Sequence, residues 1–151
     1  MNYKSNIGYR KELLTRLLET IIVHENEIIS ALKADFNKPE FEAVVTETSY
    51  VISDLKHTIK NLSRWAKPKR VFPFVVNIPS SDYIYKEPYG KVLIISPWNY
   101  PFQLALCPLI AAVAAGNQIL LKPSELTPNT AAIIQKIISK VFSINHVEVI
   151  Q

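Results

Sequence analysis

Two short polar motifs carry the side chains of this chain that are best suited to chemistry. The first is Ser96-Pro97-Trp98-Asn99-Tyr100-Pro101, and the second is Lys122-Pro123-Ser124-Glu125. The side-chain amide of Asn99 can donate two hydrogen bonds, which suits a developing oxyanion. Removing one such donor typically costs about 10²–10³ in rate. Lys122 and Glu125 place a cation beside a carboxylate, and a carboxylate there could accept hydrogen bonds from ribose hydroxyls.

Each motif also has a plainer interpretation. Asn99 could simply cap the helix that follows it, and the physics of the sequence alone favours that interpretation. Lys122 and Glu125 could form a surface ion pair beside a helix start, which contributes little to stability. The two motifs follow each other along the chain and are joined by one predicted helix. Together they favour a ligand site more strongly than either motif does alone.

Glycine and histidine spacing exclude several other kinds of site. The glycines are Gly8, Gly90 and Gly116, so the chain holds neither a G-x-G-x-x-G motif nor a P-loop. Any bound nucleotide must therefore be held without a glycine-rich phosphate cradle. The three histidines lie far apart, with no His-x-x-x-His or Cys-x-x-Cys spacing. We therefore expect no metal site.

Two further features receive a structural interpretation. Cys107 lies between Leu106 and Pro108 in the most apolar part of the chain, where burial raises a thiol pKa and makes the thiol inert. A basic cluster flanks Trp65 at the end of a predicted helix, where cations complement the helix dipole. We interpret the cluster as a solvated surface rather than a nucleic-acid site. Its members are Arg64, Lys67, Lys69 and Arg70.

The motifs border a stretch, residues 92–121, that contains no Asp, Glu, Lys, Arg or His and should therefore be buried. Val92–Ile95 is a continuous apolar run, as expected for a strand buried on both faces. Phe102–Ala115 predicts an apolar helix that stops at Gly116, with a kink or late start at Pro108. Gln118–Leu121 predicts the next strand.

A second helix and a third strand complete the pattern. Thr127 is the expected N-cap, and Pro128 the first residue of the helix. The apolar positions of that helix are Ile133, Ile134, Ile137, Ile138 and Val141. Val147–Ile150 predicts the last strand. The β-α-β-α-β order predicts an α/β fold with a parallel sheet, and the motifs then follow the carboxyl ends of neighbouring strands, where such sheets bind ligands.

The first part of the chain has helical periodicity. Three helices are predicted, with apolar faces on Leu13–Ile22, Ile28–Leu32 and Phe41–Leu62, the last stopping near Lys67-Pro68. Residues 71–78 and 82–87 then resemble strands, with Tyr83 and Tyr85 on one face. Pro73 and Pro79 confine the first of these to an edge strand or an extended connector. We divide the chain into 1–70, 71–89 and 90–151.

The bulk composition is that of an ordinary globular domain. The 151 residues carry a formal charge of +4, 48% hydrophobic and 20% charged residues. A single cysteine excludes an internal disulfide and fits a reducing compartment, and Met1–Ser5 opens no apolar leader. The run Leu104–Ala115 is shorter than the ~20 residues that a membrane span needs. The sequence therefore predicts a cytoplasmic protein without a membrane span.

The motifs closely resemble the aldehyde dehydrogenase superfamily, most of all its class 3 or fatty aldehyde dehydrogenase branch. Trp-Asn-Tyr-Pro at 98–101 and Lys-Pro-Ser-Glu at 122–125 are typical of that branch. Similar residues also occur at 34–40, at Trp65 and at 85–90, so the resemblance covers the whole chain. It implies helices followed by the first half of a Rossmann-like cofactor domain, with 71–89 as the bridging, oligomerisation segment.

The resemblance implies a role for each motif residue. Asn99 would supply the oxyanion donor for a cysteine thiohemiacetal, and Tyr100 would border the aldehyde pocket. The cofactor, NAD or NADP, would be held by Ser96, Pro97, Trp98, Lys122, Ser124 and Glu125. NAD is favoured because a carboxylate at Glu125 would repel a 2′-phosphate. A full-length protein would bind an aldehyde substrate and form a homodimer.

The resemblance also implies that the thiolate nucleophile and the glutamate base lie beyond the matched stretch. The last predicted strand runs to the end of the chain, with no room for the loop that should follow it. We therefore expect an N-terminal fragment, inactive alone, of an NAD(P)-dependent enzyme that oxidises aldehydes to acids through a thioester. A non-catalytic oligomerisation or regulatory module that retains the fold is the alternative.

Overall fold

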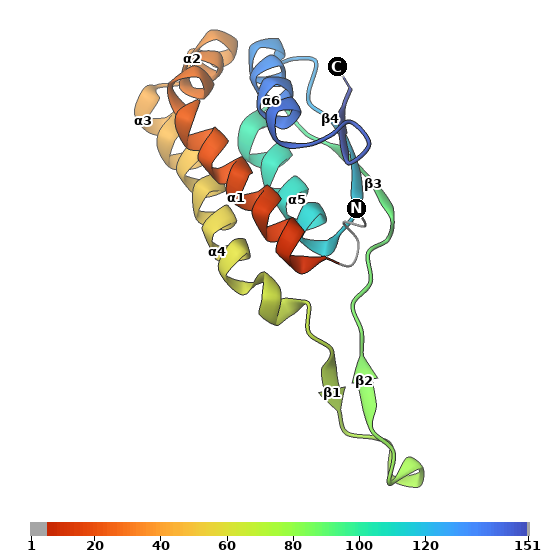
Figure 1. Cartoon of the computed structure of the whole chain (residues 1–151). Helices are drawn as coiled ribbons and strands as arrows, with labels where there is room; N and C mark the ends of the chain where they lie inside the picture. The colour runs from red at the N-terminus through yellow and green to blue at the C-terminus, as the bar shows by residue number, and fades with distance from the viewer. Residues whose placement is uncertain (1–5, 151) are drawn as a thin grey trace.

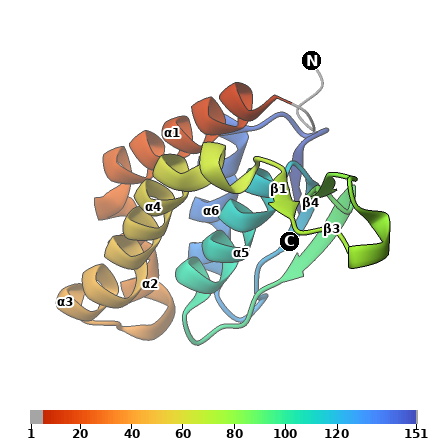
Figure 2. The ribbon, with the colours of Figure 1, turned by 90° about the horizontal axis from the view of Figure 1, so that it is seen from below.

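The computed structural model describes residues 6–150, and the expectation of no leader at Met1–Ser5 lies outside that range (Figure 1). A three-stranded parallel sheet forms one side of the body, and all of its helices stack on one face of that sheet (Figure 2). Helices α5 and α6 lie next to the sheet, and the N-terminal helices cover them. No helix within 6–150 is long and apolar enough to cross a membrane.

The N-terminal helices follow the predicted periodicity. Helix α1 spans Ile7–Val23 and α2 spans Glu25–Phe36, and each buries an apolar face in the common core. Asn6 caps α1 through a 3.0 Å hydrogen bond from the backbone nitrogen of Tyr9 to its side chain. Asn37 ends α2 in the left-handed conformation.

The third predicted helix is interrupted by a π-helical segment. Short α3, Glu40–Ala43, leads into the π-helix η1, Val44–Thr48, and then into α4, Ser49–Trp65. The prediction of a single buried apolar stripe from Phe41 to Leu62 is wrong at the start of that range. The Phe41 side chain is 79% exposed and the Val45 side chain is 51% exposed. The reason is that a π turn holds more residues than an α turn and shifts the register of the face.

The two helices beside the sheet also match the sequence pattern. Helix α5 spans Pro101–Ala115 and runs uninterrupted through Pro108, so the alternative of a late start is wrong. Gly116 ends it at φ 91°, a conformation that favours glycine. Helix α6 spans Pro128–Val141 with Thr127 at the N-cap, although the Thr127 hydroxyl donates to the Ser124 carbonyl instead of capping the helix.

The sheet has the order β3-β4-β5 and is parallel throughout. Strand β3 spans Lys91–Ile95, β4 spans Gln118–Lys122 and β5 spans Val147–Val149. Ile94, Leu121 and Val149 are neighbours in register and face the helices. Alternate residues point to the opposite face.

Burial of β3 on both faces is contradicted by the structure. Leu93 is 59% and Ile95 67% exposed, because the helices within 6–150 all lie on the other face of the sheet. Leu93 pairs with Leu120, and Leu120 with Glu148, so an apolar surface is continuous across β3 and β4. We call this surface of Leu93, Ile95 and Leu120 the open sheet face.

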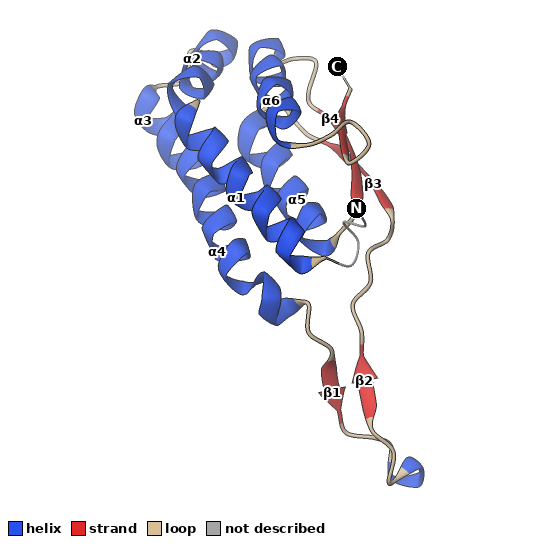
Figure 3. Cartoon of the chain, viewed as in Figure 1, coloured by secondary structure: helices blue, strands red, loops and turns tan. Residues whose placement is uncertain are grey.

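Residues 69–84 form an arm that extends from the body (Figure 3). Strands β1, Lys69–Val71, and β2, Asp82–Ile84, pair antiparallel. The sequence predicts that residues 71–78 form an edge strand or an extended connector. Only Val71 of this range lies in a strand, and Val75–Asn77 forms the 3₁₀ helix η2. The arm exposes Phe72, Phe74, Val75, Val76 and Ile78.

Candidate functional site at the carboxyl edge of the sheet

The two polar motifs begin at the same edge of the sheet, as the sequence predicts. Ile95 and Lys122 are paired at the carboxyl ends of β3 and β4. The backbone nitrogen of Ser96 donates a 3.1 Å hydrogen bond to the carbonyl of Lys122, which joins the starts of both loops. The buried Ser96 hydroxyl has no partner among residues 6–150.

The first loop presents its residues to solvent. Pro97, Trp98 and Asn99 are exposed, with Trp98 at 55%. Within the described residues, no hydrogen bond engages the Asn99 side chain, and Tyr100 rather than Asn99 occupies the N-cap of α5. The interpretation of Asn99 as a helix cap is therefore wrong. Its amide remains available to a ligand.

The second loop holds an ion pair. The ammonium of Lys122 lies 2.7 Å from the carboxylate of Glu125, and both side chains are substantially exposed. This hydrogen bond is the main reason that the pKa of Glu125 lies below its ordinary value. The Ser124 hydroxyl accepts a 3.2 Å hydrogen bond from the backbone of Leu126 and shapes the turn. The ion pair agrees with the plainer interpretation and leaves the ribose role of these residues a prediction.

A buried carboxylate that the sequence did not single out caps α5. Glu47 is fully buried, and its Oε2 accepts hydrogen bonds from the backbone nitrogens of Phe102, at 3.1 Å, and Gln103, at 2.8 Å. Its Oε1 lies 2.7 Å from the ammonium of buried Lys38. That ammonium also lies 4.4 Å from the centre of the Tyr100 ring. The available signal was a carboxylate between Val44 and Val51 at helical spacing on the buried stripe.

Asp35 caps α6 in the same way from α2. Its oxygens accept hydrogen bonds from the backbone nitrogens of Asn129, at 3.1 Å, and Thr130, at 2.7 Å. Carboxylates from distant helices therefore occupy the N-termini of both helices that follow the motifs. Because a helix N-terminus is where a phosphate would otherwise bind, the phosphates of a nucleotide would need another site.

Cys107 has the properties of a structural thiol. The pKa of Cys107 is raised to about 12, mainly because the thiol is buried and secondly because the negative charge of Asp54 lies close to it. The thiolate that a nucleophile requires is therefore scarce at neutral pH. Within 6–150 no group of three or more His, Cys, Asp or Glu side chains is placed to hold a metal ion.

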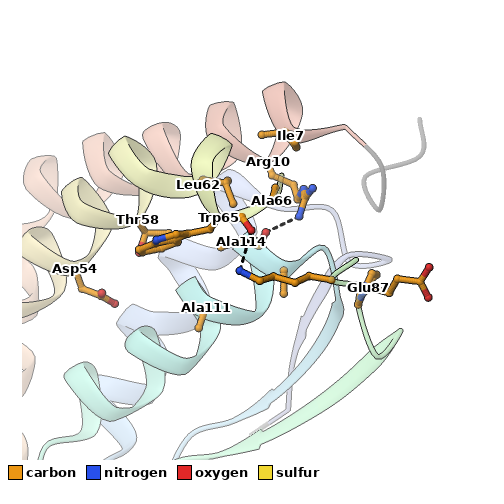
Figure 4. Close-up of a pocket in the computed structure, with 13 residues that line it drawn as sticks. Ile7, Arg10, Asp54, Thr58, Leu62, Trp65, Ala66, Glu87, Ala111 and Ala114 are labelled. Carbon is orange, nitrogen blue, oxygen red and sulfur yellow. Dashed lines mark hydrogen bonds between the residues drawn. The ribbon is translucent and has the colours of Figure 1, made fainter. Parts of the chain in front are cut away.

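A cavity lies away from both motifs, between α4, α5 and the connector to β3 (Figure 4). It has a volume of about 550 Å³, and its walls include Trp65, Ala111 and Ala114. Arg10 donates a 2.5 Å hydrogen bond to the Ala114 carbonyl at its rim, and burial lowers the pKa of Arg10. Lys86 donates to the Trp65 carbonyl at 3.0 Å. None of the predicted site residues lines this cavity.

Comparison with known proteins agrees with the resemblance. Residues 3–147 match the model of the aldehyde dehydrogenase family. The chain is 46% identical over 146 residues to the 4,4'-diaponeurosporen-aldehyde dehydrogenase of Staphylococcus aureus, covering 97% of this chain and 32% of the relative. It is 39% identical over 140 residues to the fatty aldehyde dehydrogenase HFD1 of Saccharomyces cerevisiae, covering 90% and 26%.

A solved structure shows the same fold. The substrate-bound state of Staphylococcus aureus AldH superposes with a TM-score of 0.95 at 46% identity, covering 98% of this chain and 32% of that one. The chain thus spans about a third of the length of these relatives. A further relative is aldehyde dehydrogenase family 3 member H1 of Arabidopsis thaliana, 39% identical over 141 residues and covering 91% of this chain and 29% of that relative. The predicted α/β fold and the predicted class 3 and fatty aldehyde relatives are confirmed. From its motifs, its fold and these matches, the chain belongs to the aldehyde dehydrogenase family.

Proposed function

We propose that this chain is the N-terminal third of an NAD(P)-dependent enzyme that oxidises aldehydes to carboxylic acids. The observation that carries the proposal is the junction of the two motifs at one sheet edge, where Ser96 bonds to Lys122. Asn99, exposed and without a hydrogen-bond partner within 6–150, would donate its amide to the oxyanion that forms from the aldehyde. Tyr100 would border the aldehyde.

The donors at this edge suit a dinucleotide. The Ser96 hydroxyl is buried at the start of the first loop and has no hydrogen-bond partner within residues 6–150, and Lys122 and Glu125 are accessible and oppositely charged. Ser96, Pro97 and Trp98 would line the cofactor on one side, and Lys122, Ser124 and Glu125 would bind the adenosine ribose on the other. The cofactor would supply the hydride acceptor. We favour NAD, because a carboxylate at Glu125 would repel the phosphate that NADP carries on its adenosine ribose.

The reaction also needs a thiolate and a general base, which we assign to residues outside this chain. The raised pKa of Cys107 argues against its use as the nucleophile. By itself the 151-residue chain should then bind NAD weakly and turn over no aldehyde. Isothermal titration with NAD and NADP, together with an aldehyde assay, tests this. Submicromolar binding or turnover by the pure chain would count against the assignment.

The role of Asn99 can be separated from stability. In an active protein that contains this chain, Asn99→Ala should lower kcat by about 10²–10³-fold, because an oxyanion donor is lost. The free energy of unfolding should stay within about 0.5 kcal/mol, because the Asn99 side chain is exposed. A variant with full kcat would refute the oxyanion role.

The alternative function, an oligomerisation or regulatory module without chemistry, is favoured by the exposed apolar arm. Phe72 is 83%, Phe74 73% and Val76 78% exposed, and such a surface is typical of an interaction site. Association through the arm is also compatible with the enzyme function, because a full-length homodimer could use the same surface. Sedimentation of the wild-type protein and of Phe72→Ser/Phe74→Ser tests it: a dimer that persists in the double variant would exclude the arm as the interface.

A further inference from the structure

We infer that Glu47 is a positioning residue, which sets the place of the loop that carries Asn99. This inference rests on the proposed function, because only that function gives the loop with Asn99 a catalytic role. Three observations support it: the full burial of Glu47, its two hydrogen bonds to the start of α5, and its buried partner Lys38 against Tyr100.

The start of α5 has no cap from its own loop. The N-cap residue Tyr100 makes no side-chain hydrogen bond to the helix, and Pro101 has no N–H to satisfy. Phe102 and Gln103 therefore offer the first free N–H groups of α5, and Glu47 accepts from both. A carboxylate also complements the positive end of the helix dipole. The contact thus anchors the chain three residues after Asn99.

Lys38 completes the anchor from the other side. Its ammonium bonds to Glu47 at 2.7 Å and lies 4.4 Å from the centre of the Tyr100 ring, next to Asn99 in the chain. Both members of the ion pair are buried, at 8% and 0% exposure. Breaking a buried pair of this kind is costly, because removing either partner leaves an uncompensated buried charge. The chain directly after Asn99 is therefore held by two contacts to the N-terminal part of the protein, one at Tyr100 and one at Phe102 and Gln103.

The π-helical segment brings Glu47 to this position. Glu47 and Thr48 are its two buried residues, and the Thr48 hydroxyl donates a 2.6 Å hydrogen bond to Glu25 of α2. The segment is thus tied to α2 through Thr48 and to α5 through Glu47. Such π turns are frequent at functional sites. A misplacement of about 1 Å at a reacting group can cost 10²-fold in rate, so this anchor bears directly on the use of Asn99.

Amide exchange in the 151-residue chain tests the anchor without any activity. Two double variants avoid an unpaired buried charge: Lys38→Met/Glu47→Gln keeps an acceptor for the helix N–H groups, and Lys38→Met/Glu47→Leu removes it. We expect the amides of Phe102 and Gln103 to exchange at least about 10-fold faster in the leucine variant, with the amides of Leu14 and Ile21 unchanged. Equal exchange at Phe102 and Gln103 in the two variants would overturn the inference.

Kinetics in an active protein that contains this chain test the catalytic consequence. Per titrated active site, the leucine variant should lose about 10²-fold in kcat with an unchanged KM for NAD, and the glutamine variant should recover most of the loss. The exposed Glu42→Gln serves as the matched control. Unchanged kcat per site in the leucine variant would refute positioning. If no wild-type protein that contains this chain turned over an aldehyde, the proposed function would be refuted instead, and amide exchange would still decide whether Glu47 anchors the loop.

Discussion

Asp35 of α2 holds the start of α6, with one carboxylate oxygen 2.7 Å from both the backbone nitrogen and the hydroxyl of Thr130. The other oxygen accepts from Asn129. The loop that follows Lys122 and carries Glu125 leads directly into α6, so this contact fixes the position at which the loop ends. A carboxylate from the N-terminal helices thus anchors each of the two motif-bearing loops.

Asp35→Ala should lower the free energy of unfolding by at least about 1–2 kcal/mol, because four hydrogen bonds from the start of α6 lose their acceptor. Urea unfolding followed by circular dichroism measures the change. Glu19→Ala, an exposed carboxylate of α1, is the control and should change little. Equal effects of the two substitutions would show that Asp35 does not cap α6.

The open sheet face should make the isolated chain bind hydrophobic dyes and associate. Leu93→Thr/Ile95→Thr should reduce dye fluorescence and concentration-dependent association, because the exposed apolar area shrinks while β-branched residues keep the strand. Val23→Thr, which changes a side chain 77% exposed at the end of α1, is the control. If the sheet variant binds dye as strongly as the control, the apolar surface that matters lies elsewhere.

Cys107 should react slowly with thiol reagents. Because its pKa is raised to about 12, the fraction of Cys107 present as thiolate at pH 8 is on the order of 10³-fold smaller than that of a free cysteine. Asp54→Asn should speed alkylation, because the charge of Asp54 adds to the effect of burial. Mass spectrometry after timed iodoacetamide treatment measures the rate, with Glu19→Gln as the control. Rapid labelling of the wild-type chain would contradict the raised pKa.

His146 should make the fold sensitive to acid. Burial lowers the pKa of His146 below its ordinary 6.5. As the pH falls below 6.5, the unfolded chain takes up a proton that the folded chain resists, so stability decreases until the pH passes the lowered pKa. The loss from this group cannot exceed about 1.4 kcal/mol per pH unit. Urea unfolding at pH 7 and pH 5 should give a smaller loss for His146→Gln. Identical losses would assign the acid sensitivity to other groups.

The sequence alone determined the order and type of most elements, because each is set by local chemistry. The apolar run at 92–95 and the αL-permitting Gly116 predict β3 and the end of α5 from a few neighbouring residues. Parallel β-α-β order then places the Asn99 and Lys122 loops at one edge. The aldehyde dehydrogenase motifs could be recognised for the same reason, since they are contiguous.

The tertiary structure decided what depends on residues distant in the chain. Periodicity identifies an apolar face but not whether a second layer covers the opposite one, so the exposure of Leu93 and Ile95 could not be read from their run. Capping by a nearby residue is visible in sequence, as at Asn6. The capping of α5 by Glu47 and of α6 by Asp35 is not, because it requires the π segment and α2 to be packed against those helices first.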